Sequence, residues 1–139
     1  MQFKILEHTA DIGIEVYGKG LPQLFQSAAV GMFSLMVESK GVSEKKRLHI
    51  ELNSEDREGL LVAWLNELLY YFNVKKVIPV TYRIRIEDSS LSAWIKGIEF
   101  QISKARPKLE VKAATYHQLE VIPPAKDSPL WKARIIFDV

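Results

Sequence analysis

The sequence contains no cysteine among its 139 residues, which excludes disulfide bonds, thiolate zinc sites and thiol catalysis. It also lacks any apolar run close to the ~20 residues that a membrane-spanning helix requires. The first residues, MQFKILEHTADIG, include no uninterrupted apolar segment, so we expect no secretory signal peptide. These absences fit an intracellular protein, and we expect a cytoplasmic one with no membrane partner.

The sequence also has no large excess of positive or negative side chains. The chain has 19 Lys and Arg against 17 Asp and Glu, a formal net charge of +2. This near-balance argues against bulk nucleic-acid binding and predicts no DNA partner, although a local basic patch remains open. The sequence has no repeat, low-complexity tract or Gly/Ser linker, and its 47% hydrophobic and 26% charged residues are typical of a globular domain. We therefore expect one domain over residues 1–139.

Hydrophobic periodicity predicts two long helices among many strands. Apolar residues three and four apart indicate a helix over 21–37, with Pro22 in its first turn. A second, more apolar helix is expected from a capping Ser54 to about Asn73. Strands are predicted over 2–7, 12–17, 47–52, 81–87, 91–104, 108–114, 117–122 and 131–139. The predicted fold class is α+β, a single domain with two main helices packed on a largely antiparallel β-sheet.

The motifs of the common catalytic classes are also absent. There is no GxxxxGK[ST] phosphate loop, GxGxxG turn, HExxH or GxSxG in the chain. No complete set of nucleophile, base and orienting residue can be recognised. The residues by themselves therefore predict a polar site but no reaction.

The two ends of the chain carry the strongest site candidates. In the closing stretch WKARIIFDV, alternation places Asp138 on the face opposite the apolar residues. If Val139 is the natural terminus, its α-carboxylate adds a second anionic group, and Asp11 would complete a hard-cation site for Ca²⁺, Mg²⁺ or Mn²⁺. The alternative is a frayed tail with solvated carboxylates.

Asp11 belongs to the stretch EHTADIGI, which also contains His8. The functional interpretation is a metal ligand or general base beside a carboxylate. The alternative is a turn in which the aspartate accepts hydrogen bonds from nearby backbone N–H groups.

Three further features are weaker candidates. Lys112 could contact a phosphate or carboxylate, or lie solvated on the outer side of a strand. His117 could take part in a site, or make one ordinary hydrogen bond beside a loop. A short basic cluster is too small to demonstrate RNA binding, and a solvated loop is its default interpretation. Its residues are Lys40, Lys45, Lys46 and Arg47.

Five blocks of the sequence together resemble the archease family. They occur in the family's order and cover nearly the whole chain: EHTADIGIEVYG, LPQLFQSAAVGMFSLM, LLVAWLNELLYYF, VKAATYHQLEV and WKARIIFDV. Archeases are regarded as accessory proteins of the GTP-dependent, RtcB-type tRNA-splicing RNA ligase, not as enzymes. The resemblance implies that this chain promotes guanylylation and multiple turnover of such a ligase, with only indirect tRNA involvement.

The resemblance also implies roles for individual residues. Asp11, Asp138 and Val139 match the family's metal-binding positions, and Lys112 matches its functional lysine. His8 and His117 lie in the same motifs and are included in the functional cluster. The implied cofactor is a divalent cation, with Ca²⁺ favoured and Mg²⁺ or Mn²⁺ as alternatives. From the residues alone, a metal-dependent phosphoester hydrolase and an RNA-binding or chaperone-like module remain rival functions.

Overall fold

A four-stranded antiparallel sheet brings together strands from both ends of the chain. The computed structural model describes residues 2–7, 11–39, 45–101 and 105–139. The strand order is β1-β2-β9-β8, so the last strand lies in the middle of the sheet. Its strands are β1 (Gln2–Glu7), β2 (Asp11–Gly18), β8 (Ala113–Ile122) and β9 (Trp131–Asp138).

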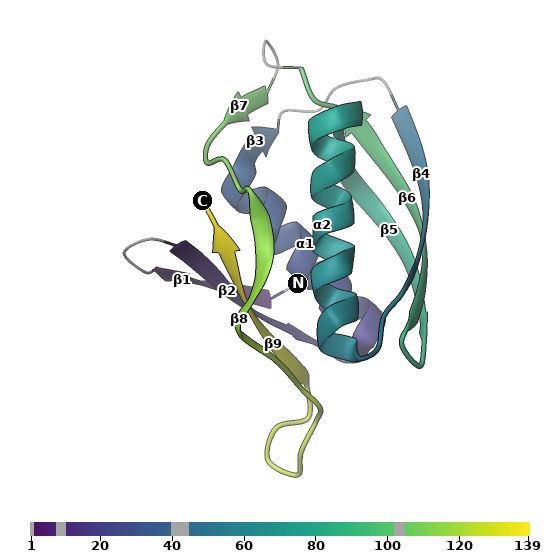
Figure 1. The fold of residues 1–139 in the computed structure, drawn as a ribbon, viewed down its shortest axis with the longest axis vertical. Helices are drawn as coiled ribbons and strands as arrows, with labels where there is room; N and C mark the ends of the chain where they lie inside the picture. Colours follow the sequence, from purple (N-terminus) through teal and green to yellow (C-terminus); the bar gives the residue numbers. More distant parts are fainter. Residues whose placement is uncertain (1, 8–10, 40–44, 102–104) are drawn as a thin grey trace.

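A second antiparallel sheet of three strands has the order β4-β6-β5. A separate pair, β3 with β7, forms a short two-stranded sheet. These strands are β3 (Val37–Ser39), β4 (Lys45–Asn53), β5 (Val77–Glu87), β6 (Ser90–Glu99) and β7 (Ala105–Pro107). Figure 1 shows the four-stranded and three-stranded sheets on opposite sides of the helices, so each sheet has one face turned away from the core.

The two helices, α1 (Leu21–Met36) and α2 (Arg57–Lys75), form the middle layer. The carboxylate of Asp56 caps α2 by accepting a hydrogen bond from Gly59 N at 2.7 Å. The predicted cap at Ser54 is therefore wrong by two residues. At the other end Lys76 has a φ of 58°, the left-handed conformation that commonly ends a helix. None of the described helices is both long and apolar enough to cross a membrane.

The core lies between the two sheets, where both helices bury large side chains. Trp64, Phe25 and Phe137 are among its largest fully buried residues. Trp64 Nε1 donates a hydrogen bond to the Phe25 carbonyl at 3.0 Å, which links α2 to α1. This bond satisfies the polar atom of a buried indole, which would otherwise be costly.

The predicted fold class is confirmed, but several strand predictions need correction. Strand β5 begins at Val77 and not at residue 81, and the short strands β3 and β7 were not predicted. The predicted strand 108–114 is irregular over 108–112, because its backbone bonds go to other elements instead of a ladder. Lys108 N bonds to Met36 O, and Lys112 N bonds to Asp138 O, each at 2.8 Å. Strand β8 then continues through the predicted break before His117, although its pairing with β9 is irregular between Thr115 and Glu120. The strand predicted over 91–104 ends at Glu99, and residues 102–104 lie outside the described residues.

Candidate functional site at one end of the four-stranded sheet

The structure places Asp11 and Asp138 directly opposite each other on neighbouring strands. Asp11 is the first residue of β2, and its partner in the antiparallel register is Asp138, the last residue of β9. Directly opposed residues project to the same face of a sheet, with Cβ atoms about 4.5–5.5 Å apart. Asp138 is exposed and Asp11 is partly buried. Two carboxylates that are 127 positions apart in sequence thus share one end of one sheet face.

That face is the one turned away from the helices. On β2 and β9 the residues facing the core are fully buried, as Ile14, Ile135 and Phe137 show. The outward positions alternate with them and include both aspartates. The Asp138 carboxylate is therefore open to a partner molecule, whereas Asp11 beside it is partly buried, with its Oδ1 shielded from solvent.

Lys112 joins this end of the sheet through its backbone. Its N–H donates to the carbonyl of Asp138 at 2.8 Å, and the next residue, Ala113, is paired with Asp138 in the register of β8 and β9. The side chain of Lys112 is exposed. The structure thus brings Lys112, from a third segment of the chain, to the end of the sheet where the two carboxylates lie.

Asn66 on α2 holds the first part of β8 in place. Its Oδ1 accepts a hydrogen bond from Ala114 N at 2.9 Å, and its Nδ2 donates to Ala114 O at 3.2 Å. This paired arrangement substitutes for a neighbouring strand on the free edge of β8. We did not predict this role, although one signal was present: an uncharged polar residue in a helix whose neighbours Leu65 and Leu68 are buried.

The other predicted residues differ in their placement. Val139 follows Asp138 and is 37% exposed, at the same end of the sheet. His117 lies farther along β8, in the irregular stretch between Thr115, opposite Ile136, and Glu120, opposite Arg134. It is exposed, and its backbone N–H is bonded to Thr115 Oγ1 at 3.3 Å. His8 lies outside the described residues.

The carboxylate pair suits a divalent cation. Like charges directly opposite each other across a sheet are destabilising, and a bound cation would offset that repulsion. Hard cations prefer carboxylate and carbonyl oxygens, and Mg²⁺ is commonly held by one or two carboxylates together with water. Within the described part of the chain, no group of three or more His, Cys, Asp or Glu side chains is placed to hold a metal. A cation held by Asp11 and Asp138 would therefore be only partly enclosed by side chains of this chain.

A third carboxylate on the same face, that of Glu15, lies in a different environment. Only 7% of Glu15 is exposed, and the Tyr17 hydroxyl donates a hydrogen bond to it. That bond, with Lys132 Nζ at 3.6 Å and Arg134 Nη2 at 3.7 Å, outweighs burial and lowers the pKa of Glu15. Glu15 is thus an ionised group already satisfied by the protein, and we assign it to stability.

Comparison with known proteins gives one consistent result. Residues 3–139 match the Archease protein family. The chain is 37% identical to Protein archease of Methanosarcina barkeri, with 99% of this chain and 96% of that protein covered. It is 33% identical to Protein archease of Pyrococcus furiosus, with 99% of each covered. The fold matches the solution structure of Methanobacterium thermoautotrophicum protein 1598 with a TM-score of 0.76, at 31% identity over 99% of this chain and 98% of that one.

Proposed function

Because the chain belongs to the archease family, we propose that it is an accessory protein of the RtcB-type tRNA-splicing RNA ligase and not itself an enzyme. In this proposal it promotes guanylylation of the ligase and returns it to the active form for multiple turnover. The ligase is the direct partner, tRNA is involved through it, and the setting is the cytoplasm. The observation that carries the proposal is the pairing of Asp11 with Asp138 at the open end of a sheet.

The proposed site works by presenting charge to the ligase. Asp11 and Asp138 would hold a divalent cation, with a main-chain oxygen of Val139 as a further ligand. When bound, such an ion stabilises negative charge on phosphate groups. Lys112 supplies a cationic side chain beside it that can contact a phosphate or a carboxylate of the partner. The residues of this chain thus bind, orient and neutralise, while the bond-forming chemistry belongs to the ligase.

The test is RNA ligation by a purified RtcB-type ligase with GTP and divalent metal, with and without this protein. We expect the wild-type protein to raise the number of turnovers and the fraction of guanylylated ligase. The double variant Asp11→Asn, Asp138→Asn should lose most of this stimulation. Asp127→Asn, an exposed residue in the loop between β8 and β9, is the matched control and should stimulate normally. Full stimulation by a correctly folded double variant would overturn the proposed role of the carboxylates.

The cation is tested separately from the ligase. Titration calorimetry of the protein alone with Ca²⁺, Mg²⁺ and Mn²⁺ should show one site that the double variant lacks and Asp127→Asn retains. We expect Ca²⁺ to bind, with Mg²⁺ and Mn²⁺ as the alternatives that the same oxygen ligands accept. Equal binding of all three ions by wild type and double variant would place the cation elsewhere.

A phosphoester hydrolase built on the same carboxylates is the rival function. A hydrolase would release phosphate from nucleotides in the presence of metal and without the ligase. Our proposal predicts no such release. The same purified protein, assayed without ligase, distinguishes the two.

A further inference from the structure

The face of the three-stranded sheet that is turned away from the helices carries an ordered array of side chains. The register aligns them in rows across β4, β6 and β5. The rows are Arg47, Lys96 and Thr81; then His49, Trp94 and Arg83; then Glu51, Ser92 and Arg85. Because side chains alternate between faces of a strand, these residues lie outside while their neighbours Leu91, Ala93 and Ile95 are buried.

The middle row is an exposed stack of flat groups. The rings of His49 and Trp94 are stacked, with centroids 4.9 Å apart and an interplanar angle of 14°. On the other side, the guanidinium carbon of Arg83 lies 5.5 Å from the centre of the Trp94 ring. Trp94 nevertheless remains 42% exposed. A large aromatic ring held in position but open to solvent is a platform on which another flat group can stack.

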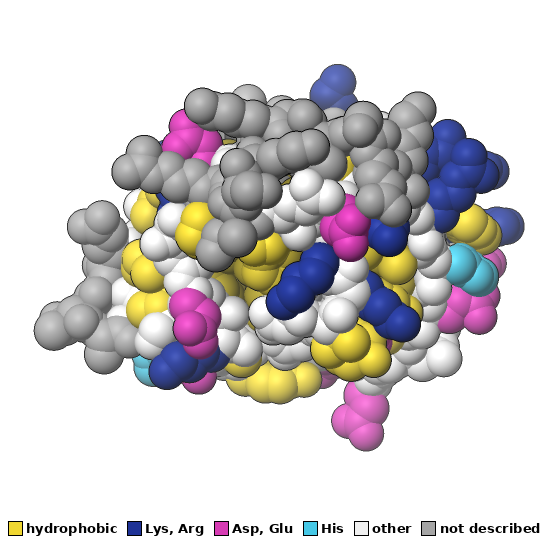
Figure 2. All heavy atoms as spheres, turned by 90° about the horizontal axis from the view of Figure 1, so that it is seen from above, with side chains coloured by type: hydrophobic (Ala, Val, Ile, Leu, Met, Phe, Trp, Pro, Cys, Tyr) yellow, Lys and Arg dark blue, Asp and Glu magenta, His cyan; other side chains and the backbone are white. Residues whose placement is uncertain are grey.

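Positive charge lies on one side of this platform, in the row of Arg47 and Lys96. Arg47 and Lys96 are directly opposite each other, an arrangement that costs stability unless an anion lies between them. Among the described residues, neither they nor Arg83 make an ion pair. Figure 2 shows Lys and Arg side chains gathered on this side of the molecule. The carboxylate of Glu51 lies at the other end of the face, where it is 3.7 Å from His49 Nε2.

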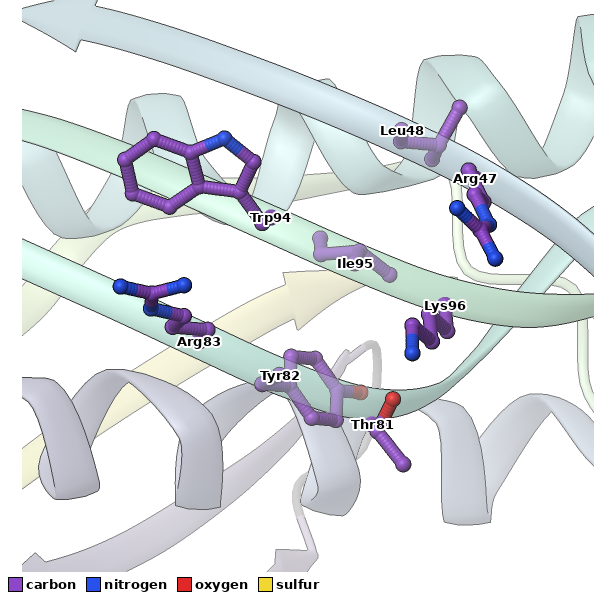
Figure 3. A pocket seen from close by; sticks show the side chains of 8 residues that line it. All are labelled: Arg47, Leu48, Thr81, Tyr82, Arg83, Trp94, Ile95 and Lys96. Atoms are coloured by element: carbon purple, nitrogen blue, oxygen red, sulfur yellow. The ribbon is translucent and has the colours of Figure 1, made fainter.

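The platform and the charges line one shallow pocket of about 380 Å³. Figure 3 shows Trp94 and Arg83 at one end of it and Arg47 and Lys96 at the other, with the helices behind the sheet. A second hollow of about 170 Å³ adjoins it and shares Thr81 and Lys96. The concave surface therefore extends along the sheet beyond the first pocket, far enough for more than one flat group.

We propose that this face binds single-stranded RNA. A base would stack on the Trp94 ring in place of the exposed Arg83 guanidinium, because base stacking is worth more than an exposed cation–π contact. The adjacent phosphates would lie by Arg47 and Lys96. Exposed aromatic rings with cationic neighbours on a sheet are how proteins bind unpaired bases and their backbone. A duplex offers no free base face, which excludes it as the occupant. The choice of RNA over DNA rests on the proposed function, whereas the recognition of a single strand rests on this surface alone.

This surface differs from the short basic cluster that the sequence predicts to be a loop. Of that cluster, Arg47 lies on this face, and Lys40 lies outside the described residues. It also differs from the carboxylate site, which lies on the opposite sheet. One molecule could therefore contact the ligase with one sheet and an RNA strand with the other.

The test is fluorescence anisotropy of a labelled RNA single strand of about ten nucleotides, a length within the usual range of such sites, with the full chain and no ligase. We expect Trp94→Ala to weaken binding at least about fivefold, the loss of one stacked base, and Trp94→Phe to restore most of it. The double variant Arg47→Ala, Lys96→Ala should reduce the slope of log K against log salt by about 1.4, from two lost phosphate contacts.

The control removes two exposed lysines on other surfaces, Lys19→Ala with Lys126→Ala, and should bind nearly as the wild type. Absence of binding at low salt, or equal loss in this control, would overturn the proposal. Equal affinity for duplex RNA would overturn the stacking platform, and equal affinity for a DNA strand of the same sequence would overturn the assignment to RNA. Because no ligase is present, the result of this binding assay does not depend on the result of the ligase-stimulation assay. Circular dichroism verifies that each variant is folded.

Discussion

Removal of the Asn66 side chain should loosen the segment that carries Lys112. Asn66 makes two hydrogen bonds to the backbone of Ala114, which is only 4% exposed. In Asn66→Ala both backbone groups lose their partner, and the edge of β8 offers no strand to replace it. Each bond is worth about 1 kcal/mol net, so the expected loss in the free energy of unfolding is about 2 kcal/mol.

This loss translates into a measurable change in melting temperature. An unfolding entropy of about 2.1 cal/mol/K per residue, over 139 residues, gives about 0.29 kcal/mol/K for the whole chain. A loss of 2 kcal/mol then lowers the melting temperature by about 7 °C. Differential scanning calorimetry of the purified protein measures it directly.

The control and the local readout make this prediction specific. Asn73→Ala removes an exposed asparagine from the same helix and should change the stability by no more than about 0.5 kcal/mol. Hydrogen exchange should show faster exchange of the Ala114 amide in Asn66→Ala only. If Asn66→Ala and Asn73→Ala have the same melting temperature, and the Ala114 amide stays protected from exchange in both, then Asn66 does not hold β8 and the reasoning is refuted.

Two other features give predictions of their own. Because the pKa of Glu15 is lowered from its usual 4.5 by the Tyr17 hydrogen bond, its stabilising contribution is complete above that pH and is lost as the pH falls through the lower folded value. Urea unfolding across acidic pH should therefore show a shallower loss of stability in Glu15→Gln than in wild type, and an equal loss would contradict this. Gly18→Ala would place a Cβ 2.4 Å from the backbone N of Leu24 and 2.8 Å from its Cα, so we expect a loss of about 1–3 kcal/mol. Gly20→Ala, where the nearest atom is 3.8 Å away, is the control without a clash, and as a change at the N-cap of α1 it should cost less, about 0.5–1 kcal/mol.

Much of the fold could be predicted because hydrophobic periodicity reports burial directly. The last strand illustrates this: alternation placed Trp131, Ala133, Ile135, Phe137 and Val139 on the core face. The middle three are fully buried, whereas Trp131 is partly buried and Val139 is 37% exposed at the two ends of the run. Ile136 shows the limit of the method. It lies on the outer face as its position requires, but it is 1% exposed because it covers Gly13, where no side chain intervenes.

The carboxylate site could be predicted only in part. Alternation gave Asp138 an outward direction, but only the resemblance to a known family linked it with Asp11, since no local pattern reports which strands become neighbours. The roles of Asn66 and Trp94 were missed for the same reason. Each depends on a contact with a distant segment, Ala114 in one case and His49 with Arg83 in the other.

The central position of β9 has a consequence for how the protein is made. Every other described element leaves the ribosome before this strand does, yet β2 and β8 have no direct pairing without it. The four-stranded sheet must therefore close after synthesis of its other three strands, through contacts between the two ends of the chain, which is a slow class of folding step. A chain interrupted before residue 131 would also lack Asp138. The carboxylate pair therefore forms only in a molecule that has been translated through β9 and has closed this sheet.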